Sequence, residues 1–158
     1  MSLTLAPMTA EQLARLRGGL EQSYGEDLAE ARGLSPEAAR AEAASQIARL
    51  LPDGVATPGA LLRVALVDGV EVGWIWTALP DADRPGTAWI HNIEVHSAHR
   101  GRGHARRMIQ LAEAELAGLG VGQLGLNVFG RNTVAKRLYD GLGFRVTAQQ
   151  MSKPLPPS

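Results

Sequence analysis

The residues of this sequence that are best suited to chemistry lie in and around a short turn rich in glycine and arginine. The turn reads Arg100-Gly101-Arg102-Gly103 and lies between an apolar run and a helical pattern. A helix that begins directly after a strand leaves its first backbone N–H groups without partners, and its dipole adds partial positive charge there. Gly101 and Gly103 lack the Cβ that would keep a ligand away from the backbone. These features predict a site for a phosphorylated small molecule.

Two familiar nucleotide-binding loops do not fit this turn. The dinucleotide fingerprint requires a third glycine, and Arg106 stands at that position. The fingerprint also requires an acidic residue about 20 residues later, where this sequence reads Gly122-Gln123-Leu124-Gly125. The nucleoside-triphosphate loop requires Lys followed by Ser or Thr after its glycines, and this turn lacks that pair. A different phosphate-bearing ligand is therefore expected.

A carboxylate, Glu94, lies near the end of the apolar run that leads into the turn. Burying a carboxylate is costly, so Glu94 is expected to be solvated, paired or functional. A general base is one such function, and His91 and His96 are alternatives because histidine titrates closer to neutral pH. If residues alternate strictly between the faces of a strand, Glu94 and His96 share a face and His91 lies on the other.

Strands and turns are predicted in the middle and at the end of the chain. The strands are expected at residues 61–67, 70–79, 87–95, 124–129 and 144–152. Asp68-Gly69 is a tight hairpin signal between the first two. The third strand is apolar at many successive positions, which favours a central strand covered on both faces. Residues 154–158 are expected to form a frayed tail.

Four helices are predicted around these strands. Thr9 begins a capping box, and Ser35-Pro36 is a second helix start. The third helix follows the turn, with an inward stripe formed by Ala105, Met108, Ile109, Ala112, Leu116 and Leu119. Asn132 caps the fourth helix, whose Ala135, Leu138 and Leu142 are expected to face inward. The order of elements predicts an α/β fold of three layers, with a mixed central sheet and helices on both faces.

Composition narrows the class of protein. A chain of 158 residues with 45% hydrophobic and 20% charged residues is expected to form one domain over residues 1–158. Sixteen basic and sixteen acidic side chains cancel, so nucleic-acid and membrane partners are not expected. The absence of cysteine excludes disulfides, thiolate metal sites and a thiol nucleophile, and no metal site is expected. A cytoplasmic protein is the expectation, because no apolar run is long enough for a membrane span.

Two blocks together resemble the GNAT superfamily of acetyl-CoA-dependent N-acetyltransferases. The first, Arg100-x-x-Gly103-x-Ala105, resembles the superfamily's pyrophosphate-binding signature. The second runs from Leu126 to Phe144, with Asn, then Ala and Leu-Tyr on a helix, then Gly-Phe. The resemblance covers residues 61–153, preceded by two helices within residues 1–60. A weaker similarity, at residues 51–58 and 151–155, is to an uncharacterised bacterial subgroup.

The resemblance implies the same α/β fold, acetyl-CoA as co-substrate and direct acetyl transfer to a primary amine. It implies that the backbone of Ile93 and Val95 pairs with the pantetheine arm and that the Val95 N–H stabilises the oxyanion. It also implies that the main chain of the turn holds the pyrophosphate, through Arg100, Gly101, Arg102, Gly103, His104 and Ala105. Asn132 is expected to bond the coenzyme in addition to capping its helix.

For the chemical step, the resemblance places the phenol of Tyr139 near the coenzyme sulfur. A phenol can protonate the departing thiolate, so Tyr139 is the predicted general acid. Glu94 is the predicted base, acting directly or through a water; a contact with the acceptor, or an ion pair with a nearby arginine, is the alternative for its carboxylate.

The acceptor is not specified by the sequence beyond a small-molecule or peptide amine. Available residues near the expected acceptor site are Tyr24, Glu26, Asp27, Trp74 and Trp76. The chain is expected to be a monomer or a homodimer. The alternative to an enzyme is a non-catalytic acyl-CoA-binding domain of the same fold.

Overall fold

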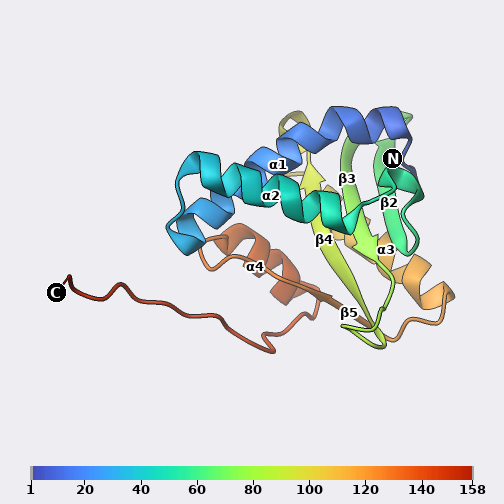
Figure 1. The fold of residues 1–158 in the computed structure, drawn as a ribbon. Helices are drawn as coiled ribbons and strands as arrows, with labels where there is room; N and C mark the ends of the chain where they lie inside the picture. Colours follow the sequence, from blue (N-terminus) through green and yellow to red (C-terminus); the bar gives the residue numbers. More distant parts are fainter. Residues whose placement is uncertain (1, 158) are drawn as a thin grey trace.

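The computed structural model describes residues 2–157. The fold has three layers: one five-stranded sheet in the middle and helices on each of its faces (Figure 1). The elements are β1 (Leu3–Pro7), α1 (Ala10–Arg32), α2 (Pro36–Leu50), β2 (Ala60–Val67), β3 (Val70–Ala78), β4 (Thr87–Val95), α3 (His104–Gly118), β5 (Gln123–Leu126) and α4 (Thr133–Gly141), with 3₁₀ turns at Gly54–Ala56 and Ser97–His99. The strand order is β1-β2-β3-β4-β5, with β4 and β5 parallel and the other pairs antiparallel. The predicted three-layer α/β fold with a mixed sheet is confirmed.

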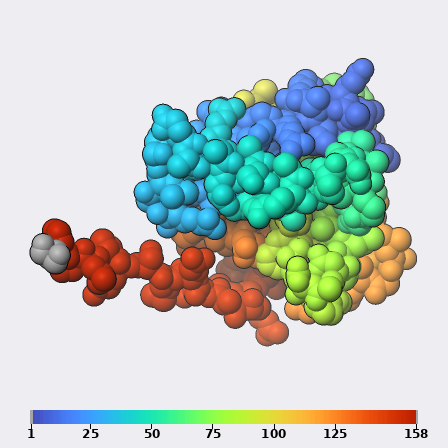
Figure 2. Space-filling view, in the orientation of Figure 1, coloured from blue at the N-terminus to red at the C-terminus, as the bar shows by residue number. Residues whose placement is uncertain are grey.

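Helices α1 and α2 cover one face of the sheet, as the front of the molecule shows in Figure 2. Both begin where the sequence predicts. Thr9 forms a reciprocal capping box with Gln12, and the Ser35 side chain accepts from the Ala38 N–H, with Pro36 at the first helical position. The apolar core beneath these helices includes Trp74 and Trp76 of β3.

Helix α3 covers the other face, with Met108, Ile109, Ala112 and Leu116 buried as predicted. Leu138 of α4 and its capping residue Leu142 pack against the same core, and Ala135 is half-buried. Leu119 was expected in this core but is 59% exposed. The helix ends at Gly118, so Leu119 leaves the helical stripe as the capping residue.

Strands β4 and β5 pair over only part of their length. The parallel register joins Thr87–Ile90 of β4 to Gln123–Leu126 of β5, and β4 then runs on to Val95. The predicted strand at residues 124–129 is therefore shorter, because the chain turns away after Leu126. This early end of β5 leaves the last five residues of β4 free of the β5 ladder, at the edge where a ligand can enter.

The central strand β4 is interrupted by a bulge. Trp76 of β3 pairs with Asn92, while the neighbouring Thr77 pairs with Ile90, so His91 is the extra residue. Ile90 faces the α3 core before the bulge and Ile93 faces it afterwards. His91 and Asn92 consequently both lie on the α1/α2 side, because a bulge shifts the alternation by one residue.

Two elements differ from the sequence predictions. The edge strand β1 was not predicted, since five residues ending in Pro7 give little alternation to detect. The predicted strand at residues 144–152 is wrong: residues 145–157 are exposed, have no helix or strand, and extend away from the body (Figures 1 and 2). A four-residue β5 offers a short ladder, too few hydrogen bonds to offset the cost of ordering a largely polar segment.

Candidate active site

The turn between β4 and α3 has the backbone conformation of an anion-binding loop. Gly101 and Gly103 adopt left-handed backbone angles, with φ of 76° and 79°. Nothing lies within 4 Å of the position that a Cβ would occupy at either glycine. Gly103 is the N-cap of α3 and provides no side-chain cap. The start of this helix is thus open to a ligand rather than closed by its own chain.

The main-chain N–H groups of residues 101–106 have no hydrogen-bond acceptor among the residues that the structure describes. The neighbouring amides are used, since His99 donates to the His96 carbonyl and Arg107 donates to the Gly103 carbonyl. Successive free N–H groups at a helix start form a concave site for anionic oxygens. The geometry therefore fits the diphosphate that the sequence predicts for this turn.

The arginine side chains of this region have different environments. The Arg100 Nε donates to the Val95 carbonyl at 2.9 Å, which ties the turn to the end of β4. Arg102, Arg106 and Arg107 are exposed. Arg106 reaches Gly141 at the end of α4, so the start of α3 and the end of α4 are neighbours. These side chains add positive charge around amides that already point outward.

The free edge of β4 presents alternate backbone groups. The His96 N–H donates to the Val72 carbonyl of β3 at 2.8 Å. Because successive N–H groups of a strand point to opposite edges, the N–H groups of Ile93 and Val95 face away from β3. They point to the edge that β5 leaves open. A pantetheine arm at this edge would find strand-like partners, as the resemblance implies.

Tyr139 of α4 lies on the α3 side of the sheet. Its half-buried ring packs against the core that also includes Ile93 and Val95, and it meets Phe144 edge to face at 5.7 Å between centroids. Burial raises the pKa of the Tyr139 phenol above its usual value of 10.0. The hydroxyl is therefore protonated at neutral pH, as a general acid must be.

Glu94 lies on the opposite face of β4 from Tyr139. It pairs across the strands with Trp74, which belongs to the core beneath α1 and α2. The Glu94 side chain is 37% exposed and lies 3.4 Å from the His96 Nδ1. The predicted shared face of Glu94 and His96 is confirmed by this contact. Groups suited to be acid and base thus flank β4 from opposite sides.

His91 also lies on the Glu94 face, so the expectation that it lies on the other is wrong. The bulge turns its ring onto Trp76, with centroids 4.6 Å apart. Burial, assisted by the charge of Arg84, lowers the pKa of His91 from 6.5 to about 4. A base with so low a pKa is neutral at pH 7 but binds a proton weakly, which disfavours His91 as the general base.

Asn132 performs its predicted capping role. Its side-chain oxygen accepts from the Ala135 N–H at 3.1 Å. The residue is exposed at the start of α4, so its amide nitrogen is available to a ligand. Lys136 donates to the Gly130 carbonyl in the same loop.

The residues suggested for the acceptor site differ in their surroundings: the two tryptophans lie in the core, whereas the other three residues lie on α1. Trp74 and Trp76 are core residues, 0% and 3% exposed. The Tyr24 hydroxyl bonds the Gln46 side chain at 2.5 Å, and Asp27 pairs with Arg131. Glu26 lines a pocket of about 580 Å³ between α1 and α2, which Arg131 also borders.

Two buried donors on the α1/α2 side have no hydrogen-bond partner within the described residues. They are the Trp74 indole Nε1 and the Asn92 Nδ2. Trp74 pairs across the strands with Glu94, and Asn92 pairs with Trp76. Both donors therefore lie on the same face of the sheet as Glu94. Buried donors of this kind are normally satisfied by water or by a ligand.

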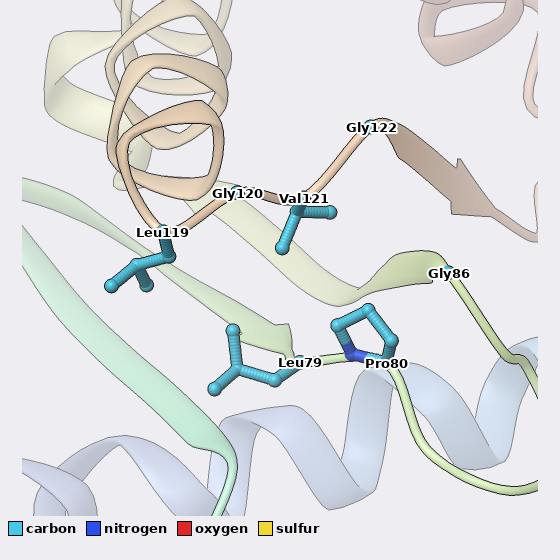
Figure 3. A pocket seen from close by; sticks show the side chains of 7 residues that line it. All are labelled: Leu79, Pro80, Gly86, Leu119, Gly120, Val121 and Gly122. Carbon is cyan, nitrogen blue, oxygen red and sulfur yellow. The ribbon is translucent and has the colours of Figure 1, made fainter.

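A larger pocket, of about 670 Å³, lies elsewhere on the molecule (Figure 3). It is lined by Leu79, Pro80, Gly86, Leu119, Gly120, Val121 and Gly122. These residues follow β3, precede β4 or connect α3 to β5, away from Val95 and the turn, and none has a titratable side chain. The pocket offers no group for acid–base work.

Sequence reasoning missed Glu71 and Arg15, which complete the surroundings of His96. Glu71 of β3 lies 2.6 Å from the His96 Nε2, and Arg15 of α1 holds Glu71 through two hydrogen bonds. Neither residue belongs to a motif, and the three are brought together only by the pairing of β3 with β4 beneath α1. No local signal identifies them. Among residues 2–157, no group of three His, Asp or Glu side chains is arranged to hold a metal ion, and no helix is both long and apolar enough to cross a membrane.

Comparison with known proteins agrees with this geometry. The model of the Acetyltransferase (GNAT) family matches residues 24–144. The chain is 29% identical over 156 residues to the uncharacterized N-acetyltransferase YycN of Bacillus subtilis, and the matched region covers 98% of this chain and 100% of YycN. The N-acetyltransferase YdgE of the same organism is 25% identical, over 98% of this chain and 99% of that protein.

Solved structures show the same fold. The crystal structure of YycN matches with a TM-score of 0.91 at 28% identity, over 99% of this chain and 100% of that chain. The PaiA N-acetyltransferase of Thermoplasma acidophilum, solved with coenzyme A, matches with a TM-score of 0.71 at 17% identity, over 95% of this chain and 94% of that chain. The family match, the relatives and the site geometry lead to one conclusion: the chain belongs to the GNAT family and is an acetyltransferase.

Proposed function

We propose that this enzyme transfers the acetyl group of acetyl-CoA directly to a primary amine. The observation that carries the proposal is the row of unpartnered main-chain N–H groups at residues 101–106. These amides would hold the coenzyme diphosphate. The Arg100 N–H was expected to join them, but it donates to the Ser97 carbonyl at 3.5 Å and is not free. Ile93 and Val95 would bind the pantetheine arm, and Asn132 would contact the coenzyme through its free amide nitrogen. Acetyl-CoA supplies the thioester that carries the acetyl group.

The chain's own residues would supply three chemical functions. The Val95 N–H, which points to the open edge of β4, would stabilise the oxyanion. Tyr139, protonated on the α3 side, would donate its proton to the leaving thiolate. Glu94, on the opposite face, would accept a proton from the amine, since an ammonium with a pKa of about 10.4 has no lone pair at neutral pH.

The acceptor is proposed to be an amine on a small molecule or a peptide. One relative is the [Ribosomal protein bS18]-alanine N-acetyltransferase of Haemophilus ducreyi. It is 31% identical over 70 residues, and this matched region covers 44% of this chain and 48% of the relative. The partly exposed carboxylate of Glu94 favours an acceptor that arrives as a cation.

Two measurements test the proposal. Acetyl-CoA at about 100 times its dissociation constant should stabilise the protein by about 2.7 kcal/mol, which raises Tm by roughly 5–10 °C. Thiol release from acetyl-CoA is then followed with alanine-terminated peptide, lysine, spermidine and aminoglycoside as acceptors. Stabilisation with amine-dependent thiol release supports the proposal. Stabilisation without thiol release for any amine supports the alternative, a non-catalytic acyl-CoA-binding domain. The absence of stabilisation contradicts both.

A further inference from the structure

The imidazole of His96 lies between two carboxylates that approach its two ring nitrogens. The Nε2 is 2.6 Å from a Glu71 carboxylate oxygen, and the Nδ1 is 3.4 Å from a Glu94 carboxylate oxygen. All three side chains are partly buried, at 24% exposure for His96, 17% for Glu71 and 37% for Glu94. Because the carboxylates occupy opposite nitrogens, they do not converge on one point as metal ligands would.

Glu71 is held as an anion. The Arg15 guanidinium donates to both Glu71 oxygens, at 2.6 Å and 3.2 Å. These bonds are the largest cause that lowers the pKa of Glu71, against the opposing effect of burial. An ionised carboxylate only accepts hydrogen bonds. The short contact therefore requires that the His96 Nε2 carry a proton and donate it to Glu71.

This arrangement sets the state of the other ring nitrogen. In a neutral imidazole with its proton on Nε2, the Nδ1 bears a lone pair. An ionised Glu94 opposite it also bears only lone pairs, and the separation of 3.4 Å is long for a hydrogen bond. One added proton converts this pair of acceptors into a donor and an acceptor. The Glu94–His96 pair is thus built to take up one proton.

We propose that Glu94 and His96 act as a dyad that removes and stores one proton from the acceptor amine, with Glu71 and Arg15 as the pair that positions His96. This rests on the proposed function. An N–H bond of the acceptor ammonium breaks, its electron pair stays on nitrogen, and an O–H bond forms on Glu94. The proton then passes to the His96 Nδ1, giving an imidazolium between two carboxylates, and leaves to solvent past the exposed part of Glu94. Glu94 is the catalytic residue of the dyad, and His96 acts through it.

Imidazole NMR tests the dyad without any acceptor. Full-length ¹⁵N-labelled protein is titrated, and His96 is assigned by its loss in His96→Gln. The charged groups facing the ring are Glu71 from β3 and Glu94 from β4, with Arg15 of α1 behind Glu71. The neutral ring should carry its proton on Nε2. Glu71→Gln should remove this preference for Nε2, because the carboxylate that only accepts hydrogen bonds is replaced by an amide that can also donate. Glu94→Gln should change the Nδ1 resonance of the ring, because the Glu94 carboxylate lies next to that nitrogen.

A matched control is Glu115→Gln. Glu115 also pairs with an arginine, Arg63, at 3.1 Å and is partly buried, but it lies on α3. This variant should leave the His96 ring resonances unchanged. A proton on Nδ1 in the neutral ring, or equal responses to Glu94→Gln and Glu115→Gln, would overturn the dyad.

The second test measures steady-state kinetics with an amine that proves to be acetylated in the thiol-release experiment. His96→Gln should lower kcat by about 10–100-fold and leave the affinity for acetyl-CoA unchanged. Glu71→Gln should move the acid limb of kcat/KM to lower pH, which a merely structural role would not do. A normal kcat in His96→Gln contradicts the dyad. If no amine is acetylated, the proposed function fails, while the NMR result still decides whether the pair shares a proton.

Discussion

The proposed coenzyme side and the proposed acceptor side of β4 are built in different ways. On the proposed coenzyme side, the candidate binding groups lie in one continuous segment from Ile93 to Arg106, and most of them are main-chain N–H groups. On the acceptor side, the groups around Glu94 are side chains from three elements: Arg15 from α1, Glu71 from β3 and His96 after β4. A main-chain site depends on local backbone geometry, whereas a side-chain site depends on how distant elements pack.

The two sides also separate the proposed acid from the proposed base. Tyr139 packs with the α3 core, and Glu94 lies with the α1/α2 core across β4. Separate surroundings would allow a phenol and a carboxylate to serve as the proposed acid and the proposed base at one reaction centre. A change on one side should therefore leave the function of the other side largely intact.

The largest expected effect is from Tyr139→Phe on the coenzyme side. Loss of the general acid should lower kcat by about 10²–10⁴-fold, because the thiolate must then leave without a proton. Phe keeps the edge-to-face contact with Phe144, so stability and acetyl-CoA affinity should change little. Steady-state kinetics and a thermal shift with acetyl-CoA measure the two quantities. Unchanged turnover would remove Tyr139 from the mechanism.

The next effect concerns the free energy of unfolding of the protein in acid, which should depend on His91. The pKa of His91 falls from 6.5 to about 4 on folding, so the unfolded chain binds the proton more readily between these values. Stability should therefore decrease as pH falls from about 6.5 to 4, by about 3 kcal/mol. His91→Phe keeps an aromatic ring against Trp76 and removes the titration, so this part of the acid sensitivity should be lost.

Urea unfolding at several pH values provides the measurement. The difference in unfolding free energy between the two proteins should change with pH only within that window. Parallel losses of stability in both proteins would show that another group carries the acid sensitivity, and that His91 is less buried than its contact with Trp76 implies.

The backbone of the proposed coenzyme side could be predicted better from the sequence than the side-chain arrangement around Glu94, for the same structural reason. Gly101, Gly103 and the bounds of β4 follow from short-range patterns, and the structure places them as expected. The bulge at His91 adds one residue without any sequence mark, which made the predicted face of that histidine wrong. Arg15 and Glu71 lie 56 residues apart in the chain, and only the packing of α1 on β3 brings them together. The strand predicted at residues 144–152 failed because its pairing partner, β5, ends early.

A smaller effect is expected from Gly103→Ala, which tests whether main-chain geometry holds the coenzyme. At φ of 79°, a Cβ introduces strain of about 1–2 kcal/mol. Relief of that strain would turn the free amides away from the ligand and weaken acetyl-CoA binding about tenfold. Gly120→Ala is the matched control. Gly120 has φ of 84° and nothing within 4 Å of the position of a Cβ, and it follows the far end of α3 from the turn. It should destabilise the protein similarly and leave the coenzyme affinity unchanged. Equal affinity losses in both variants would mean that the effect is global.

The smallest effect should come from Arg131→Gln, which removes a side-chain contact between the loop after β5 and α1. Arg131 bonds Asp27 at 2.7 Å and also pairs with Glu30, but its side chain is 49% exposed. Exposed ion pairs are screened by salt and contribute little, so Tm should fall by less than about 4 °C, and less at high salt. Arg63→Gln provides the contrast, since Arg63 is 20% exposed and bonds both Glu115 and the Leu62 carbonyl. A larger loss for Arg131→Gln than for Arg63→Gln would mean that the loop after β5 is anchored to α1 as firmly as α3 is anchored to β2. The Arg131 ion pairs would then contribute to a rigid contact between this loop and α1, although the Arg131 side chain is 49% exposed.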